Sequence, residues 1–173
     1  MKLSTINVPG GARLAIILPY GTNRPTSILD WQRKVFDLFG IALNQIECPF
    51  PAQSHGFFLD RIVEHTLDQW DYLIICEMDV IPLRPGCVRQ VMDNIQDGRT
   101  LFGGVQQSNH IFINGTAQHV YVAPSFLCIS KNLYEALGRP SFDHSPRGDT
   151  AEELTWRVKE RGFNLGLVYP SKV

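Results

Sequence analysis

The chain has 173 residues, of which 44% are hydrophobic and 19% charged, the size and composition of one soluble globular domain spanning residues 1–173. The 16 basic and 17 acidic residues leave a formal net charge of −1, which argues against nucleic acid or an anionic membrane as the main partner. No apolar run is long enough to cross a membrane, no signal peptide is recognisable and no C-x-x-C pair occurs, so we expect a cytoplasmic protein.

Strands and helices are predicted to alternate along the chain. Residues 14–18 (LAIIL) form a continuous apolar run, typical of a strand covered on both faces, and the polar loop PYGTNRPTS follows it. A helix is expected next, and its apolar face at helical spacing comprises Ile28, Trp31, Gln32, Val35 and Phe39.

The rest of the chain continues the alternation. A strand near residues 42–48 precedes a helix at about 57–69, and the buried strand 72–77 precedes a helix at about 86–96. The remaining elements are expected to be strands at 100–107 and 121–130, helices at 131–137 and 149–161, and a last strand at 164–170. Pro124 predicts an edge or a bulge at the start of its strand, because proline cannot donate a ladder hydrogen bond.

A β-α-β-α-β order at this spacing predicts an α/β fold with a mostly parallel central sheet and helices on both faces. Ligands of such sheets bind at the carboxyl ends of the strands. Residues 20–23 lie at the carboxyl end of the first predicted strand, and Glu77 and Asp79 lie at the carboxyl end of the strand 72–77.

The two carboxylates stand in the stretch YLIICEMDVIPL. Residues i and i+2 of a strand point to the same face, so Glu77 and Asp79 would repel each other and would each lose solvation. Mg²⁺ or Mn²⁺ relieves both costs, and such ions often take one or two carboxylates together with substrate phosphates. The alternative is a turn in which Asp79 caps the chain ahead of Pro82 while Glu77 is solvated. The carboxyl end of a buried strand favours the metal–phosphate site.

In this setting YLIICEMDVIPL resembles the strand and acid-x-acid motif of GT-A-fold glycosyltransferases of the family 2 type, in which the motif is most often Asp-x-Asp. The resemblance extends from about Leu14 to Pro170 and rests on the order and spacing of segments. It implies a nucleotide-diphospho-sugar transferase fold, a Mn²⁺ or Mg²⁺ ion, a nucleotide-sugar donor, and a sugar or other hydroxyl acceptor.

The resemblance also implies roles for residues on the donor side. LAIILPYGTNR resembles the family's first strand, whose end cradles the nucleotide base, and so points to Pro19 and Tyr20. ALNQIECPF lies where the family has a strand ending in an acid that contacts the base, which makes Glu47 the candidate. HGFFLDRIVEH lies in the place of a helix whose early residues approach the nucleotide. Arg61 of this segment either reaches a phosphate or belongs to a solvated face.

The metal ligands follow from the same resemblance. Asp79 is expected to bind the metal and the diphosphate directly. Glu77, where the family usually has Asp, is expected to contact the donor sugar or ribose, or to reach the metal through water. Many relatives place a metal-binding His close to the position where this sequence reads YPSKV, and His144 is the candidate substitute.

GDTAEELTWRVKERGFNL resembles the later helix that carries the family's catalytic acid, although it has no Glu-Asp pair. An inverting enzyme needs one base to deprotonate the acceptor hydroxyl, and Asp149 is the first candidate. The alternative, of equal weight, is that Asp149 caps the helix, because Asp149 and Glu152 form the D-x-x-E pattern of a capping box. Glu152 or Glu153 would then be the base. Glu153 is expected to face the cleft and Glu152 to be solvated.

The leading hypothesis is a metal-dependent, inverting glycosyltransferase. A nucleotidyltransferase also needs a parallel sheet, a metal and phosphates, but it normally has a Gly-rich, basic loop after the first strand, whereas PYGTNRP has one Gly and one Arg. A non-catalytic nucleotide-sugar-binding domain is the third hypothesis, and the Glu in place of Asp at position 77 is compatible with it.

Overall fold

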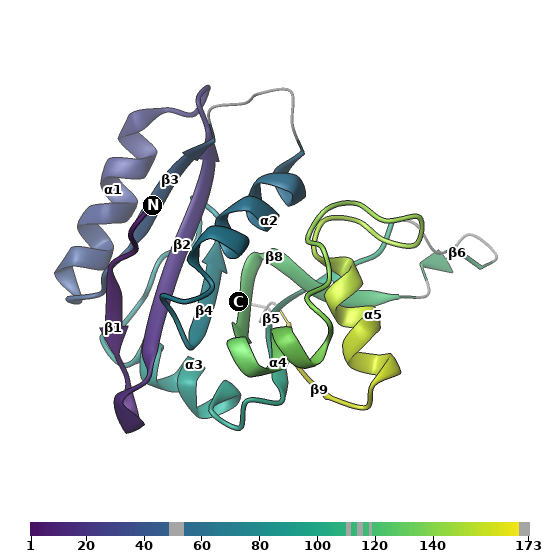
Figure 1. The fold of residues 1–173 in the computed structure, drawn as a ribbon. Coiled ribbons are helices and arrows are strands. Elements are labelled where there is room, and N and C mark those ends of the chain that lie inside the picture. Colours follow the sequence, from purple (N-terminus) through teal and green to yellow (C-terminus); the bar gives the residue numbers. More distant parts are fainter. Residues whose placement is uncertain (49–53, 110–111, 114–115, 118, 170–173) are drawn as a thin grey trace.

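The computed structural model describes residues 1–48, 54–109, 112–113, 116–117 and 119–169 (Figure 1). Its strands are β1 (Thr5–Asn7), β2 (Arg13–Gly21), β3 (Asn44–Cys48), β4 (Tyr72–Cys76), β5 (Thr100–Gln107), β6 (Phe112–Ile113), β7 (Thr116–Ala117), β8 (Val120–Ser130) and β9 (Asn164–Val168). Its helices are α1 (Thr26–Leu38), α2 (His55–Thr66), α3 (Cys87–Ile95), α4 (Lys131–Ala136) and α5 (Glu152–Glu160), and a 3-10 turn, η1, spans Pro9–Gly11. No helix in the described part of the chain is long and apolar enough to cross a membrane.

Each predicted strand and helix is present, with ends that differ by a few residues. The expected last strand reached Pro170, which lies outside the described residues; β9 ends at Val168. The short strand β1 and the small β6–β7 hairpin were not predicted, because two or three residues are too few to show a period.

Seven of the described strands form one sheet (Figure 1). Six of them follow the order β1, β2, β4, β8, β5, β9, and the seventh is β3. β1 and β3 pair with successive parts of β2. β1 pairs with residues 13–15 of β2, and β3 pairs with residues 17–21. β2, β3, β4, β5 and β9 run in one direction, whereas β8 is antiparallel to both of its neighbours. The expectation of a mostly parallel sheet therefore holds for the direction of most strands, but the sheet is mixed.

Pro124 lies in a bulge of β8, as one of the two alternatives predicted. Gly103 of β5 pairs with Leu127 and Val105 pairs with Val122, so two steps along β5 match five along β8. The proline lies among the extra residues, where the β5–β8 ladder is interrupted and no hydrogen bond from its nitrogen to β5 is required. The bulge also supplies the carbonyl of Ser125, which accepts the backbone N–H of Glu77 at 3.0 Å.

Helices cover both faces of the sheet, which explains the continuous apolar run in β2. Ala15 and Ile17 face the core formed with α2, α4 and α5, whereas Leu14 and Ile16 face the core formed with α1 and α3. All four side chains are buried. Because the crossover helices lie on both faces, the carboxyl ends of the parallel strands remain the accessible edge for a ligand.

The expected inward face of α1 is confirmed at Gln32, which is buried, and is wrong at Trp31 and Ile28, which are exposed. The buried side chains are those of Leu29, Gln32 and Phe36, whereas Trp31 is 66% exposed and Ile28 is 42% exposed. Gln32 is buried because its amide is fully used: Nε2 donates to the carbonyls of Glu77 at 3.0 Å and Val80 at 2.8 Å. The helix thus turns a polar side chain inward to hold the turn that follows β4.

The start of α2 is fixed by close backbone packing. Ser54 caps the helix by accepting the N–H of Phe57 at 3.0 Å, and its hydroxyl donates to Asp143 at 2.5 Å. Gly56 lies so close to the chain at 142–143 that an added Cβ would lie 2.4 Å from the carbonyl oxygen of Phe142. This contact sets the position of His55, the first residue of the helix.

Gly56→Ala is therefore expected to lower the free energy of unfolding by about 1–3 kcal/mol, because backbone and not a flexible side chain would have to move. Urea denaturation measures the change. Gly86→Ala is the matched control, since a Cβ there meets nothing within 4 Å, and we expect it to change stability by less than about 0.5 kcal/mol. Equal effects of the two substitutions would contradict the packing described for α2.

Candidate functional site

A pocket of about 410 Å³ lies at the carboxyl edge of the sheet, where β2 and β4 end. It is lined by Pro19, Tyr20, Gly21, Arg24, Ile28, His55, Glu77, Met78 and Asp79. Four residues assigned to the donor site from the sequence, Pro19, Tyr20, Glu77 and Asp79, therefore come together in space. We call this the edge pocket.

Glu77 and Asp79 stand on a turn and not on a continuation of the strand. β4 ends at Cys76, and the N–H of Val80 donates to the carbonyl of Glu77 at 3.1 Å, which closes the turn. The amide of Gln32 binds the first and last carbonyls of the same turn. Both carboxylates still line one pocket, so the predicted proximity is found, but a turn produces it and not the alternation of a strand.

The electrostatics of the edge pocket suit a cation. Burial raises the pKa of Glu77, the neighbouring carboxylate of Asp79 raises it further, and Arg24 opposes the rise. Asp79 is exposed, so its oxygens are accessible to an ion. Two repelling oxygen donors in a partly desolvated pocket fit Mg²⁺ or Mn²⁺, whose charge would remove the repulsion.

Arg24 and His55 are polar members of the edge pocket to which the sequence assigned no role. Arg24 belongs to the loop after β2, where a lone Arg among Gly, Asn and Pro gives no pattern. His55 keeps much of its surface exposed, yet desolvation lowers its pKa, so it is a neutral hydrogen-bonding group at pH 7. A cation and a neutral imidazole beside the two acids provide partners for phosphate and hydroxyl groups.

Two donor-site candidates do not line this pocket. Glu47 lies opposite Tyr20 in the β2–β3 register, with its side chain exposed at the sheet edge. Arg61 is exposed on α2 and lies 3.6 Å from Glu64, so it belongs to the solvated face that was the alternative. Neither residue contacts the space that the two acids enclose.

His144 does not complete a metal site with the two acids. Its Nδ1 lies 3.1 Å from Oδ1 of Asp149, and it does not line the edge pocket. In the described part of the chain, no three His, Cys, Asp or Glu side chains converge on one point. Among the described residues, the edge pocket therefore offers an ion two carboxylates, Glu77 and Asp79, a set that would need substrate phosphates to complete it.

Asp149 does not cap a helix through its side chain. α5 begins at Glu152, and its N-cap residue is Ala151, in the left-handed conformation at φ 63°. The carboxylate of Asp149 instead accepts the N–H of Thr150 at 2.7 Å and faces His144. Its side chain is 26% exposed, which leaves an oxygen accessible to an acceptor hydroxyl.

Glu152 is fully buried, so the expectation that it is solvated is wrong. Its Oε2 accepts the N–H of Asp149 at 2.9 Å, which is one half of the capping box. Its Oε1 lies 3.6 Å from Nε2 of His119, whose ring stacks on Trp156 at 3.8 Å between centroids. A carboxylate enclosed in this way cannot contact a substrate, and it positions the backbone of Asp149 instead.

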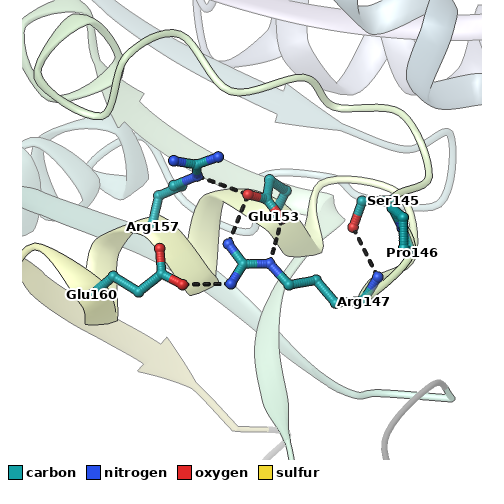
Figure 2. A pocket seen from close by; sticks show the side chains of 6 residues that line it. All are labelled: Ser145, Pro146, Arg147, Glu153, Arg157 and Glu160. Carbon is teal, nitrogen blue, oxygen red and sulfur yellow. Dashed lines mark hydrogen bonds and ion pairs between the residues drawn. The ribbon is translucent and has the colours of Figure 1, made fainter.

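Glu153 faces away from the edge pocket, contrary to expectation, and lines a separate pocket (Figure 2). Arg147 binds both carboxylate oxygens, at 2.8 and 2.9 Å, and Arg157 donates to one of them at 2.7 Å. These hydrogen bonds, Arg147 first, lower the pKa of Glu153. A carboxylate stabilised as an anion is a poor general base, so the geometry leaves Asp149 as the remaining candidate.

Tyr121 links the region around Asp149 to the edge pocket. Its side chain is buried, and burial raises its pKa strongly. The carboxylates of Asp149, Glu152 and Glu77 each raise it further. The carboxylates of both regions thus disfavour ionisation of the same buried tyrosine.

No protein-family model matches the chain, and no curated protein matches it. Among solved structures, the chain is similar to CMP:2-keto-3-deoxy-manno-octonic acid synthetase complexed with CTP. The TM-score is 0.51 and the sequence identity is 12%, over 92% of this chain and 90% of that chain. The chain thus has an α/β fold with a mixed central sheet, similar to the fold of that synthetase.

The raised pKa of Glu77 predicts a gain in stability on Glu77→Gln in the absence of divalent cations. The folded protein disfavours the Glu77 carboxylate, so the wild type loses stability as pH rises from the ordinary pKa of glutamate through the raised one. Glutamine does not ionise, and we expect the variant to be more stable by about 0.5 kcal/mol at pH 7 and equal to the wild type below pH ~4.

Urea denaturation across this pH range, in the presence of EDTA, measures the difference. Glu47→Gln changes an exposed carboxylate near the same edge of the sheet and should not reproduce the pH-dependent gain. A loss of stability in Glu77→Gln at pH 7 would show that the carboxylate is structurally required.

Proposed function

We propose that this chain is a metal-dependent, inverting glycosyltransferase that moves a sugar from a nucleoside-diphosphate donor to an acceptor hydroxyl. The observation that carries the proposal is the edge pocket itself. It combines the ends of β2 and β4, two mutually repelling carboxylates, one guanidinium and one neutral imidazole. This set of groups matches a magnesium- or manganese-bound diphosphate more closely than an uncharged ligand.

Asp79 would hold the ion directly, and Glu77 would support it or contact the donor sugar. The bound ion would stabilise the charge that develops on the diphosphate as the glycosidic bond breaks. Arg24 is placed to share that charge, and Tyr20 and Pro19 would contact the base at the end of β2. The exposed carboxylate of Asp79 and the half-buried one of Glu77 suit these unequal roles.

Asp149 would accept the proton of the acceptor hydroxyl. His144 faces one of its oxygens, and Glu152 holds its backbone from inside the protein. The carboxylate is thus oriented from two directions while part of it stays exposed. An inverting transfer requires one such base, on the side of the sugar opposite the leaving diphosphate.

A nucleotidyltransferase is the second candidate, because the fold is compatible with that activity as well. The synthetase that the chain resembles was solved with CTP, and at 12% identity the likeness concerns the fold alone. The two activities would share the metal and phosphate ligands of the edge pocket. They differ in the product released, which is a nucleoside diphosphate in one case and pyrophosphate in the other.

Calorimetry with UDP or GDP tests the shared part of the proposal. We expect Mn²⁺ to strengthen nucleotide binding to the wild type, and Asp79→Asn to weaken the Mn²⁺-dependent binding by about 10- to 100-fold. Asp93→Asn, which removes an exposed carboxylate from α3, is the control and should bind as the wild type does. Nucleotide binding that Mn²⁺ does not change would overturn the metal-site assignment.

Product analysis separates the candidate activities. A panel of nucleotide sugars with Mn²⁺ should release nucleoside diphosphate slowly by hydrolysis and faster with a suitable acceptor. CTP with free sugars should release no pyrophosphate. Asp149→Asn is expected to reduce acceptor-dependent turnover by about 10²- to 10⁴-fold without weakening nucleotide binding. Pyrophosphate release would favour the nucleotidyltransferase, and metal-dependent binding without either product would favour a non-catalytic domain.

A further inference from the structure

A second and larger pocket, of about 680 Å³, lies between α1, α3 and the face of the sheet. It begins where the acid-bearing turn ends, because Val80 lines this pocket and residues 77–79 line the edge pocket. Its walls are mostly aliphatic and aromatic, and include Ile16, Phe36, Ile74, Val88, Val91 and Phe126. We call this the apolar pocket.

Apolar side chains are also exposed at the mouth of the apolar pocket. Ile81 is 45% exposed, Leu83 is 84% exposed and Val168 is 42% exposed, and all three belong to its lining. Isolated apolar residues on a surface are common, but three at the opening of one apolar cavity form a continuous hydrophobic path inward. The volume falls in the range of small-molecule sites.

Among the residues that the structure describes, Arg84 is the one charged residue that lines the apolar pocket. Its side chain is exposed, and its guanidinium donates to the side-chain oxygen of Gln90. Arg84 takes part in none of the ion pairs found among the described residues. An unpaired guanidinium beside an apolar cavity can bind one anionic group with paired hydrogen bonds.

We propose that the apolar pocket binds a single-chain amphiphile, with its hydrocarbon chain between α1 and α3 and its phosphate or carboxylate head on Arg84. The charge argues for this occupant: among the described residues, no carboxylate lines the pocket, and the one cation that does lies in the exposed segment at the mouth. A purely apolar ligand would leave Arg84 without a role, and a polar ligand would lose its hydration without gaining hydrogen bonds from the apolar walls. This site is separate from the edge pocket and does not depend on the proposed transferase activity.

Binding of dodecyl phosphate to the intact chain, below its micelle concentration, tests the proposal. We expect one molecule per protein, with affinity rising roughly three- to fourfold for each methylene added between octyl and dodecyl phosphate. Laurate should bind as well, and dodecanol at least about tenfold more weakly, because it lacks the charge. Alkylation of Cys87, which lines the pocket, should slow when dodecyl phosphate is bound.

Three variants locate the ligand. Arg84→Gln should weaken dodecyl phosphate binding at least about tenfold and leave dodecanol binding unchanged. Val88→Trp should fill the pocket and weaken both, while thermal unfolding confirms that it folds. Arg89→Gln alters an exposed Arg of α3 that does not line the pocket, and it should bind like the wild type.

Absence of binding below the micelle concentration would overturn the proposal. Binding that neither Arg84→Gln nor Val88→Trp reduces would also overturn it, because the ligand would then lie elsewhere. A last arm uses phosphatidylcholine vesicles with and without phosphatidate. Sedimentation with the anionic vesicles alone, without binding of monomeric dodecyl phosphate, would assign Ile81 and Leu83 to a membrane surface instead.

Discussion

The candidate site depends on two hydrogen bonds from the side chain of Gln32. Its amide nitrogen binds the carbonyls of Glu77 and Val80, and so fixes both ends of the turn that carries the acids. Without these two hydrogen bonds, the mutual repulsion of the Glu77 and Asp79 carboxylates would favour an open loop in the absence of metal. The same turn separates the edge pocket from the apolar pocket. One buried polar residue of α1 therefore binds the turn that borders two cavities.

The antiparallel strand β8 is the second constraint, because it joins the two halves of the molecule. It pairs with β4 on one side and β5 on the other, and its bulge at Pro124 provides the carbonyl that holds Glu77. β8 also carries Tyr121, whose pKa responds to carboxylates of both halves. The bulge thus helps to position the end of β4, and β8 also binds α5, because the N–H of Val122 donates to the hydroxyl of Thr155 at 3.1 Å.

The sequence predicted the elements of the fold well, because long apolar runs and helical periods are local properties. It failed where a contact distant in sequence decided the outcome. Trp31 and Ile28 were wrongly assigned to the buried face of α1, whereas Gln32 of the same predicted face is buried, by partners 45 and 48 residues away. The burial of Glu152 could not be read from its neighbours either, since His119 belongs to another part of the chain. Arg24 and His55 gave no pattern, and only folding places them beside the acids.

The position of the candidate base bears on which transfer the site could perform. In nucleotidyl transfer the attacked atom is the α-phosphorus, close to the metal ligands, so a base would be needed at the turn itself. In glycosyl transfer the attacked atom is the sugar carbon beyond the diphosphate, farther from the metal. Asp149 does not line the edge pocket and is oriented by His144 and Glu152. A carboxylate outside the pocket of the proposed metal ligands fits the second geometry better than the first, and this is the argument for proposing the glycosyltransferase before the nucleotidyltransferase.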